Sequence, residues 1–505
     1  MELFMALLPA LIMITLVIVT RRVLSSLLTG LIIAAFIYAD FNPLNALSYL
    51  FESLVGILTS LDWYLPILVF VVLIGAITST LAFIGGIKAF AEWGVSKVKS
   101  RVASQALTGL LGVIICIDDY FNALVIGEVS IPLTDAYKVS RAKLAYLIDS
   151  TSAPVVIMMP LSTWGAYIIA ILGGLFAGND YTLHSGFSAF IAAIPYQFYP
   201  LSAIALVFIT LFMKRDIAAM ETYEKDALKG CDHSKLVIDS EEETPKENTG
   251  VTHHALIVSI GSLVGTTLIL MFALAGFRFS GLLDQDITIP LFFGGLVSFA
   301  VALIFGVSAH KVNILKMGEA SLKGMLSMAK SAIPILILAW MVSTAVQDLE
   351  AGSLIASAIE GSNISITVLP VTLFLVAGGM AFATGTSWGA FGILLPIAVP
   401  IALSTNPEFM PLFIAAVLGG AVFGDHASPV SDTTVLSATG AQSKLHAHFI
   451  SQLPYVLISA GIAALSYMTY GLFESLALSY FVLILGIVVF ALVLKRKPTT
   501  ESMVE

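Results

Sequence analysis

The segment at residues 423–442 contains the side chains best suited to chemistry, in the sequence FGDHASPVSDTTVLSATGAQ. Two carboxylates and an imidazole lie among six Ser and Thr hydroxyls, and Pro429 interrupts them. Carboxylate and hydroxyl oxygens can hold a proton or a hard cation such as Na⁺. Because Pro429 breaks a helix, we expect Asp425 and Asp432 to flank an unwound stretch. The candidate ligands in this segment are Asp425, His426, Ser428, Ser431, Asp432 and Thr433.

Apolar runs on both sides of this segment indicate that it lies inside a membrane. A carboxylate at the centre of a bilayer costs on the order of 3 kcal/mol, so it usually marks a functional site. Broken, polar backbone is tolerated there only where protein or a water-filled cavity satisfies it. His426 allows two interpretations: it could sense pH, or it could be a buried histidine with satisfied hydrogen bonds.

Composition places the whole chain in the membrane class. Of 505 residues, 58% are hydrophobic and 11% are charged, and the mean hydropathy is +0.97. Soluble domains carry about 25% charged residues. Apolar runs of a length that spans a bilayer as a helix recur along the chain, at 3–20, 23–39, 63–84, 187–213, 255–275, 287–307, 364–383, 450–470 and 480–494. These runs predict an all-α polytopic membrane protein, because helices satisfy their own backbone hydrogen bonds.

Basic residues predict the orientation, since short cytoplasmic loops carry the excess of Lys and Arg. Arg21 and Arg22 follow the first apolar run, and Lys214–Arg215 and the cluster at 495–497 follow later ones. We therefore expect a multi-pass protein of the cell membrane, with an external N-terminus and a cytoplasmic C-terminus. Lys330 is an isolated base within an apolar run, and we assign it no role.

One hydrophilic segment, at residues 222–253, divides the chain near its middle. It is rich in acidic residues and poor in apolar ones, which is typical of a solvated, mobile linker. The predicted organisation is therefore a first membrane repeat at 1–221, a cytoplasmic linker at 222–253, a second membrane repeat at 254–494 and a cytoplasmic tail at 495–505.

A short motif occurs in both halves. Residues 162–167 read STWGAY and residues 386–391 read TSWGAF. The segment at 149–155 (DSTSAPV) also resembles that at 425–430 (DHASPV), since each begins with aspartate and ends with Pro-Val. Two repeats with interrupted polar segments predict a secondary transporter whose site lies near the bilayer midplane. The motif adds Ser162, Thr163, Thr386 and Ser387 to the candidates.

Adjacent carboxylates in the first half could also bind a cation. Asp118 and Asp119 follow an apolar run, and Asn122 comes three residues later. Two buried neighbouring carboxylates cannot both ionise cheaply, but a bound cation favours the charged form. Competition of H⁺ and Na⁺ for one carboxylate is the minimal chemistry of an antiporter. The alternative is that these acids cap a helix at the membrane interface.

Asp149, Ser150 and Thr151 precede Pro154 in another apolar run. They could form a helix N-cap, with proline near the first turn. The same geometry presents free N–H groups and hydroxyls to an ion or to an anionic substrate, so cap and site could be one feature.

The sequence also allows a protein of a different class. Residues 385–389 fit GxSxG, the nucleophile pattern of serine hydrolases, with Ser387 as nucleophile and His426 as base. The first-half counterpart has Leu161 in place of the leading glycine, so paired helix breaks account for the motif better. No P-loop, zinc-protease motif or nucleic-acid-binding stripe is present, and we expect no enzyme activity, no cofactor and no nucleic-acid partner.

Five blocks, at 118–124, 147–155, 162–167, 386–391 and 424–441, together resemble the NhaC-type sodium/proton antiporter family of the ion-transporter superfamily. The resemblance implies about 11–13 transmembrane helices in two inverted repeats with re-entrant hairpins, and commonly a homodimer. Relatives include malate/lactate exchangers and amino-acid carriers coupled to Na⁺ or H⁺. The expected function is exchange of cytoplasmic Na⁺ for external H⁺, with Na⁺ candidates Asp118, Asp119, Asp149, Asp425 and Asp432.

Two alternatives stay open beside this expectation. The same segments could serve a Na⁺- or H⁺-coupled carrier of an amino acid or small carboxylate, because helix starts with free N–H groups hold a carboxylate as readily as they frame a cation. The third is the hydrolase at Ser387. The expected partners are the lipid bilayer, Na⁺, H⁺ and, in the carrier alternative, a small organic solute.

Overall fold

The computed structural model describes residues 2–20, 22–59, 64–95, 98–116, 118–178, 185–236, 251–278, 285, 287–308, 312–349, 354 and 366–499. Residues 237–250 of the predicted linker and residues 500–505 of the predicted tail lie outside these residues.

The described part of the chain is built from helices, apart from one isolated bridge between Lys235 and Ser443. The helices before the linker are α1 (Glu2–Thr20), α2 (Val23–Tyr38), α3 (Pro43–Thr59), α4 (Tyr64–Phe83), α5 (Gly86–Val95), α6 (Arg101–Ile114), α7 (Asp119–Ala136), α8 (Arg141–Val156), α9 (Thr163–Gly178), α10 (Gly186–Ala193), η1 (Ile194–Tyr196), α11 (Phe198–Met213) and α12 (Ala218–Leu228). Those after it are α13 (His254–Leu274), α14 (Thr288–Ser308), α15 (Ile314–Asp348), η3 (Ile366–Val368), α17 (Leu369–Thr384), α18 (Ser387–Thr405), η4 (Pro407–Phe409), α19 (Met410–Ala427), α20 (Asp432–Gly440), α21 (Leu445–Phe473) and α22 (Leu476–Lys495).

Within the described residues, nine helices are long and apolar enough to cross a membrane. They are Leu65–Phe83, His254–Leu274, Thr288–Ser308, Ile314–Val342, Ile366–Thr384, Ser387–Thr405, Pro407–Ala427, Leu445–Phe473 and Leu476–Lys495. Shorter apolar helices occur at Leu24–Tyr38, Arg101–Ile114, Thr163–Phe176 and Gly186–Tyr196. The chain is a polytopic α-helical membrane protein, which confirms the predicted fold class.

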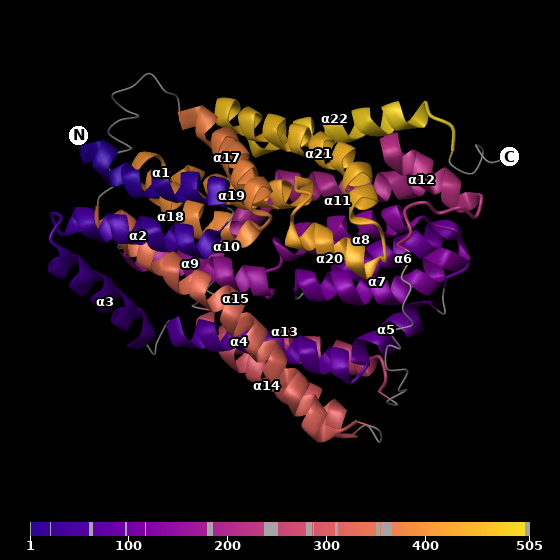
Figure 1. Ribbon diagram of the computed structural model, residues 1–505, viewed down its shortest axis with the longest axis horizontal. Coiled ribbons are helices and arrows are strands. Elements are labelled where there is room, and N and C mark those ends of the chain that lie inside the picture. Colours follow the sequence, from indigo (N-terminus) through magenta and orange to yellow (C-terminus); the bar gives the residue numbers. More distant parts are fainter. Residues whose placement is uncertain are drawn as a thin grey trace.

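The helices form two groups around a buried middle. α4, α13, α14 and α15 pack together in the lower part of Figure 1, while α17, α19, α21 and α22 pack in the upper part. Between them lie α8, α9, α18 and α20, which contact helices of both halves of the sequence. Every residue of α8 is buried, and so are nearly all residues of α19. Polar residues on these two helices therefore face protein and not lipid.

The prediction of a solvated linker from residue 222 onward is wrong for residues 222–236. Residues 222–228 belong to α12, and Glu224 on this helix is buried. The reason is the N-terminus of α8, whose backbone N–H groups have no partner within the helix. Ser140 N donates to Glu224 at 2.8 Å, Arg141 N to Asp232 at 2.8 Å and Ala142 N to Ser234 Oγ at 3.0 Å.

Further contacts fix this hydrophilic segment against the membrane part. Arg101 lies 2.6 Å from Glu224, and Leu236 N donates to Gln442 O at 2.9 Å. Glu224 and Asp232 are therefore acceptors for a buried helix, a role that composition alone could not distinguish from that of solvated charges. We call residues 218–236 the α8 clasp.

We expect Asp232→Ala to lower the apparent melting temperature of the purified protein. The change leaves Arg141 N without its acceptor at the start of a buried helix, which costs about 1–3 kcal/mol. The matched control is Glu319→Ala, which removes an exposed carboxylate paired only with Lys323 on its own helix and should change stability little. Equal melting temperatures for both variants would contradict the role of the clasp.

Candidate functional site

Both copies of the repeated motif lie at breaks between helices. α8 ends at Val156 and α9 begins at Thr163, whereas α17 ends at Thr384 and α18 begins at Ser387. Trp164 and Trp388 meet edge to face, with ring centroids 5.9 Å apart. Trp388 also contacts Tyr167, with centroids 4.7 Å apart. The two motifs, far apart in the sequence, thus touch in the middle of the molecule.

Gly385 forms the break between α17 and α18. Its φ of 71° is left-handed, a conformation that glycine adopts without strain. A Cβ atom here would lie 2.4 Å from the carbonyl oxygen of Val430. The turn between α19 and α20 is therefore packed directly against Gly385. Asp432 N donates to Gly385 O at 3.1 Å.

Asp425 lies at the centre of the hydroxyl groups around these breaks. It is on the last turn of α19, and its side chain is buried. Oδ2 accepts from Ser387 Oγ at 2.7 Å, and Oδ1 accepts from Thr433 Oγ1 at 3.1 Å and from Ser431 Oγ. The predicted unwound stretch around Pro429 separates α19 from α20. One carboxylate thus accepts hydrogen bonds from three hydroxyls at the starts of α18 and α20.

Asp149 is the centre of a second buried polar cluster, in the middle of α8. Its Oδ2 accepts from Gln452 Nε2 at 2.7 Å and lies 3.2 Å from His448 Nε2. Oδ1 lies 3.7 Å from His426 Nε2, and His426 Nδ1 is 2.9 Å from the Tyr199 hydroxyl. This geometry leaves both interpretations of His426 open.

The two clusters adjoin through Thr434, whose hydroxyl lies 3.5 Å from Asp149 Oδ2. Thr434 follows Thr433, which contacts Asp425. The carboxylates of the first and second halves are therefore joined by one short segment of α20.

Asp118 and Asp119 stand at the start of α7, as the capping alternative expects, but both are buried, with exposed fractions of 3% and 1%. Trp164 Nε1 donates to Asp119 Oδ1 at 2.9 Å. Thr163 Oγ1 donates to Asp118 Oδ2 at 3.1 Å. Both acids are therefore enclosed by protein, and they belong to the centre that contains the two tryptophans.

Several predicted candidates hold backbone instead of joining a carboxylate. Asn122 Nδ2 donates to Gly112 O and Ile115 O at 2.8 Å, and Ser428 Oγ donates to Phe382 O at 2.7 Å. Thr151 bonds to Leu147 O, and Ser162 to Val156 O and Met159 O. Ser150 is buried on α8. Asn122, Ser162 and Ser428 thus satisfy carbonyl groups at helix ends and turns, whereas Thr151 bonds to a carbonyl inside α8.

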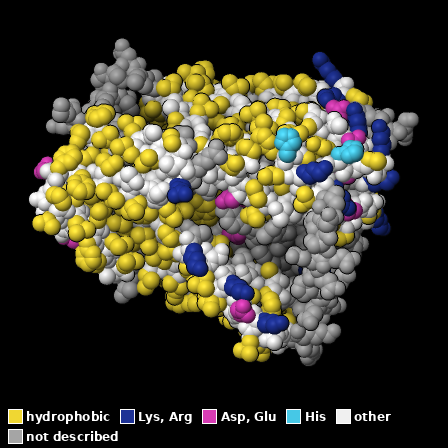
Figure 2. All heavy atoms as spheres, in the orientation of Figure 1, with side chains coloured by type: hydrophobic (Ala, Val, Ile, Leu, Met, Phe, Trp, Pro, Cys, Tyr) yellow, Lys and Arg dark blue, Asp and Glu magenta, His cyan; other side chains and the backbone are white. Residues whose placement is uncertain are grey.

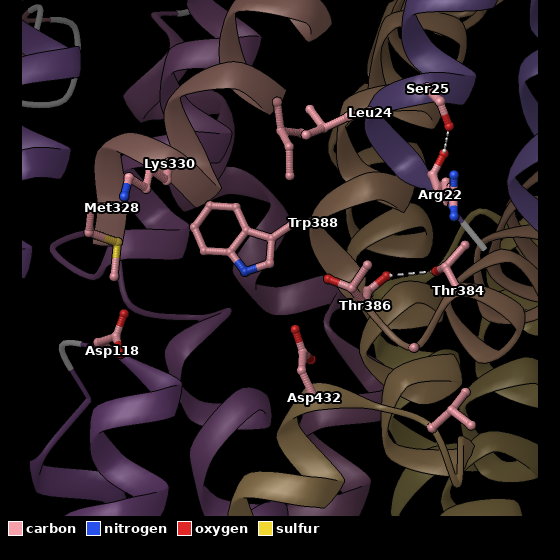
Figure 3. A pocket seen from close by; sticks show the side chains of 13 residues that line it. Arg22, Leu24, Ser25, Asp118, Met328, Lys330, Thr384, Thr386, Trp388 and Asp432 are labelled. Atoms are coloured by element: carbon pink, nitrogen blue, oxygen red, sulfur yellow. Dashed lines mark hydrogen bonds between the residues drawn. The ribbon is translucent and has the colours of Figure 1, made fainter. Parts of the chain in front are cut away.

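A cavity of about 690 Å³ opens beside the Asp425 cluster. Figure 2 shows acidic side chains in a hollow near the middle of the face, with basic side chains beside it. Asp118, Asp432, Thr386 and Trp388 line the cavity. Arg22 and Lys330 also line it (Figure 3). In the sequence, Arg22 indicated only orientation and Lys330 had no assigned role, although an isolated lysine in an apolar run was an available signal.

Neighbouring residues divide between the cavity and the buried carboxylates. Thr386 lines the cavity while Ser387 contacts Asp425. Asp432 lines it while Ser431 and Thr433 contact Asp425. In the same way Asp118 lines the cavity while Asp119 contacts Trp164. The broken segments therefore separate the cavity, lined by Asp118 and Asp432, from the carboxylates of Asp119 and Asp425.

The hydrolase alternative is wrong in its geometry. Ser387 begins a helix that follows another helix, whereas the nucleophile pattern requires a turn from strand to helix. Its hydroxyl donates to Asp425, and His426 contacts Tyr199 instead. In the part of the chain that the structure describes, no three His, Cys, Asp or Glu side chains gather as a metal site.

Comparison with known proteins gives the family. The family model of the Na⁺/H⁺ antiporter family matches residues 155–472. The chain belongs to the Na⁺/H⁺ antiporter family. This result confirms the resemblance drawn from the five sequence blocks, and it makes the chain a transporter and not an enzyme.

One relative and one solved structure match most of this family member's chain, and a second relative matches about a third of it. A protein of Haemophilus influenzae is 38% identical over 475 residues, which is 92% of this chain and 90% of the relative. The malate-2H⁺/Na⁺-lactate antiporter of Bacillus subtilis is 29% identical over 184 residues, 36% of this chain and 37% of the relative. The crystal structure of the Alcanivorax borkumensis YdaH transporter matches with a TM-score of 0.55 at 14% identity, covering 84% of this chain and 89% of the other. That structure shares the fold.

We expect Gly385→Ala to destabilise the centre of this transporter by about 1–3 kcal/mol, because the methyl group would collide with Val430 O and the left-handed φ is unfavourable for alanine. Gly379→Ala on the preceding helix is the control, since nothing lies within 4 Å of its Cβ position. Melting of the two purified variants measures the difference. A Gly385→Ala protein as stable as the control would show that the break tolerates side chains.

Proposed function

We propose that this family member exchanges cytoplasmic Na⁺ for external H⁺ at Asp425. The observation that supports the proposal is one buried carboxylate with hydroxyls from two helix breaks around it. Na⁺ prefers oxygen ligands, and a hydroxyl can turn its lone pairs toward a cation after donating to a carboxylate. A proton on the same carboxylate removes the charge that holds Na⁺. The two cations therefore compete for one site, and competition is what exchange requires.

The starts of two helices also lie beside Asp425. Ser387 begins α18, and Ser431 is the N-cap of α20, where its Oγ accepts from Thr434 N at 3.2 Å. The N-terminus of a helix carries a partial positive charge, which stabilises a nearby carboxylate. Movement of either broken segment would remove donors from Asp425. We infer that such a movement alternates the site between the two faces of the membrane.

The other Na⁺ candidates have different surroundings. Asp149 is held by Gln452 and His448, and Asp119 by Trp164. Asp118 and Asp432 line the cavity. We propose that the cavity acids attract the cation on its way to Asp425, with the N-terminus of the chain external and the C-terminus cytoplasmic.

A second candidate is a Na⁺- or H⁺-coupled carrier of an amino acid or small carboxylate. The cavity favours it, because about 690 Å³ is a volume typical of small-molecule sites, and Na⁺ alone needs no such space. The relative from Bacillus subtilis is named a malate-2H⁺/Na⁺-lactate antiporter, and malate and lactate are small carboxylates.

Asp425→Asn should abolish Na⁺-driven proton movement. Purified protein is placed in liposomes with an internal pH dye and an imposed proton gradient, and Na⁺ is added without organic solute. The wild type should dissipate the gradient, whereas the amide cannot exchange a proton for Na⁺. Glu319→Gln is the control, since Glu319 is exposed and outside the site. Full activity of Asp425→Asn would disprove the proposed site.

Thr433→Val should weaken Na⁺ activation about tenfold, because it removes one hydroxyl from the carboxylate at nearly constant volume. Thr439→Val on the same helix is the matched control, since Thr439 is exposed and bonds only to Val435 O. The measurement is the Na⁺ concentration that gives half-maximal dissipation. Equal values for the two variants would remove Thr433 from the ion site.

A further inference from the structure

The side chain of Gln452 lies between helices that come from the two halves of the chain. Its helix, α21, packs against both α8 and α19, and Gln452 is buried, with an exposed fraction of 1%. Gln452 Nε2 donates to Asp149 Oδ2 on α8 at 2.7 Å. The same nitrogen donates to His426 O on α19 at 3.0 Å. One amide group therefore ties a helix of the first half to the last turn of α19.

The partners of the Gln452 amide fix its orientation. Nε2 carries two hydrogens, and the two contacts use both of them. A backbone carbonyl and an ionised carboxylate can only accept hydrogen bonds. The reverse orientation would therefore place Oε1 of Gln452 against two oxygen atoms. The amide is held in place by the same two groups that it holds.

The end of α19 explains why His426 O needs a donor from another helix. The last carbonyl groups of a helix have no N–H partner within it, and α19 ends at Ala427, among buried residues. Asp425 O accepts from Ser428 N at 3.0 Å. His426 O accepts from Gln452 instead. A buried carbonyl without a donor is unfavourable, so Gln452 stabilises the final turn of α19.

The side chain of His426 has an anchor of its own. Its Nδ1 lies 2.9 Å from the hydroxyl of Tyr199, which is buried on α11. Residue 426 is therefore held through its backbone by Gln452 and through its imidazole by Tyr199. Asp425 is the preceding residue on the same turn. A shift of residue 426 consequently changes the direction in which the Asp425 carboxylate points.

We propose that Gln452 is a positioning residue for the ion site at Asp425, with Tyr199 as its second anchor. Gln452 fixes residue 426, and thereby directs the Asp425 carboxylate toward the hydroxyls of α18 and α20. This role rests on the proposed function, because it takes Asp425 as the group that binds Na⁺. Groups that orient the ligands of a cation, without touching the cation, commonly change its affinity about 10- to 100-fold.

The test is Na⁺ binding to the purified full chain, measured without any gradient. Na⁺ replaces choline at constant ionic strength, and the rise in melting temperature gives the dissociation constant. Asp425→Asn supplies the baseline for Na⁺ effects elsewhere on the protein. Gln452→Met removes both donors at similar volume and should raise the Na⁺ dissociation constant about tenfold.

Ser451→Ala is the matched control for Gln452→Met. Ser451 is the neighbouring residue on α21 and is also buried, and among the described residues its hydroxyl bonds only to His448 O of its own helix. It should leave Na⁺ binding unchanged. If Gln452 had only a structural role, Gln452→Met would lower the melting temperature without Na⁺ and leave the Na⁺ dissociation constant unchanged. That result would overturn the proposal.

Tyr199→Phe tests the second anchor, and it keeps the proposal testable if Gln452→Met does not fold. The change removes one oxygen atom and leaves the contacts of Gln452 in place. It should raise the Na⁺ dissociation constant about threefold or more, because the imidazole of His426 loses its hydrogen-bond partner. Weaker Na⁺ binding in Gln452→Met but not in Tyr199→Phe would trace the effect to Asp149, and would overturn the role of residue 426.

The two proposals fail separately. Exchange is measured as proton movement in liposomes, and positioning is measured as Na⁺ binding without a gradient. Na⁺ binding that depends on Gln452 and Tyr199, without Na⁺-driven proton movement in the wild type, would support the positioning role and contradict exchange. Exchange by the wild type, with unchanged Na⁺ affinity in both variants, would do the reverse.

Discussion

A carboxylate inside a membrane protein must be met by hydrogen bonds or by a cation, and Asp425 is met by hydroxyls from two other segments. This requirement ties the end of α19 to the starts of α18 and α20. The backbone at the same breaks is satisfied locally, since Asp432 N donates to Gly385 O and Ser428 Oγ donates to Phe382 O. Broken helices, carboxylate and close packing thus depend on one another.

The same need for partners accounts for the buried position of α8 and the clasp that holds it. In a helix that is buried along its whole length, the first N–H groups cannot bond to water and need acceptors from the protein. Glu224, Asp232 and Ser234 supply the acceptors from a segment that looks like a solvated linker in sequence. Because its start is fixed, α8 places Asp149 beside His448 and Gln452 of α21.

In two short segments at the centre of the molecule, adjacent residues have different surroundings. At 386–387 and at 431–433, one residue lines the cavity and its neighbours contact Asp425. Neighbouring residues of one segment therefore belong both to the cavity wall and to the Asp425 cluster.

The sequence by itself determined the membrane class and the resemblance to the family that comparison then confirmed, and it marked residues 118–119, 149 and 425–433 as candidates. Apolar runs of this length match the thickness of a bilayer, and acids among them are costly enough to mark candidate sites. It also predicted the break at Pro429. Only the tertiary structure decided which hydroxyls reach Asp425, which candidates such as Asn122 hold backbone, and that Arg22 and Lys330 line the cavity. These outcomes depend on contacts between residues tens to hundreds of positions apart, and local patterns cannot specify which of several buried polar groups meet.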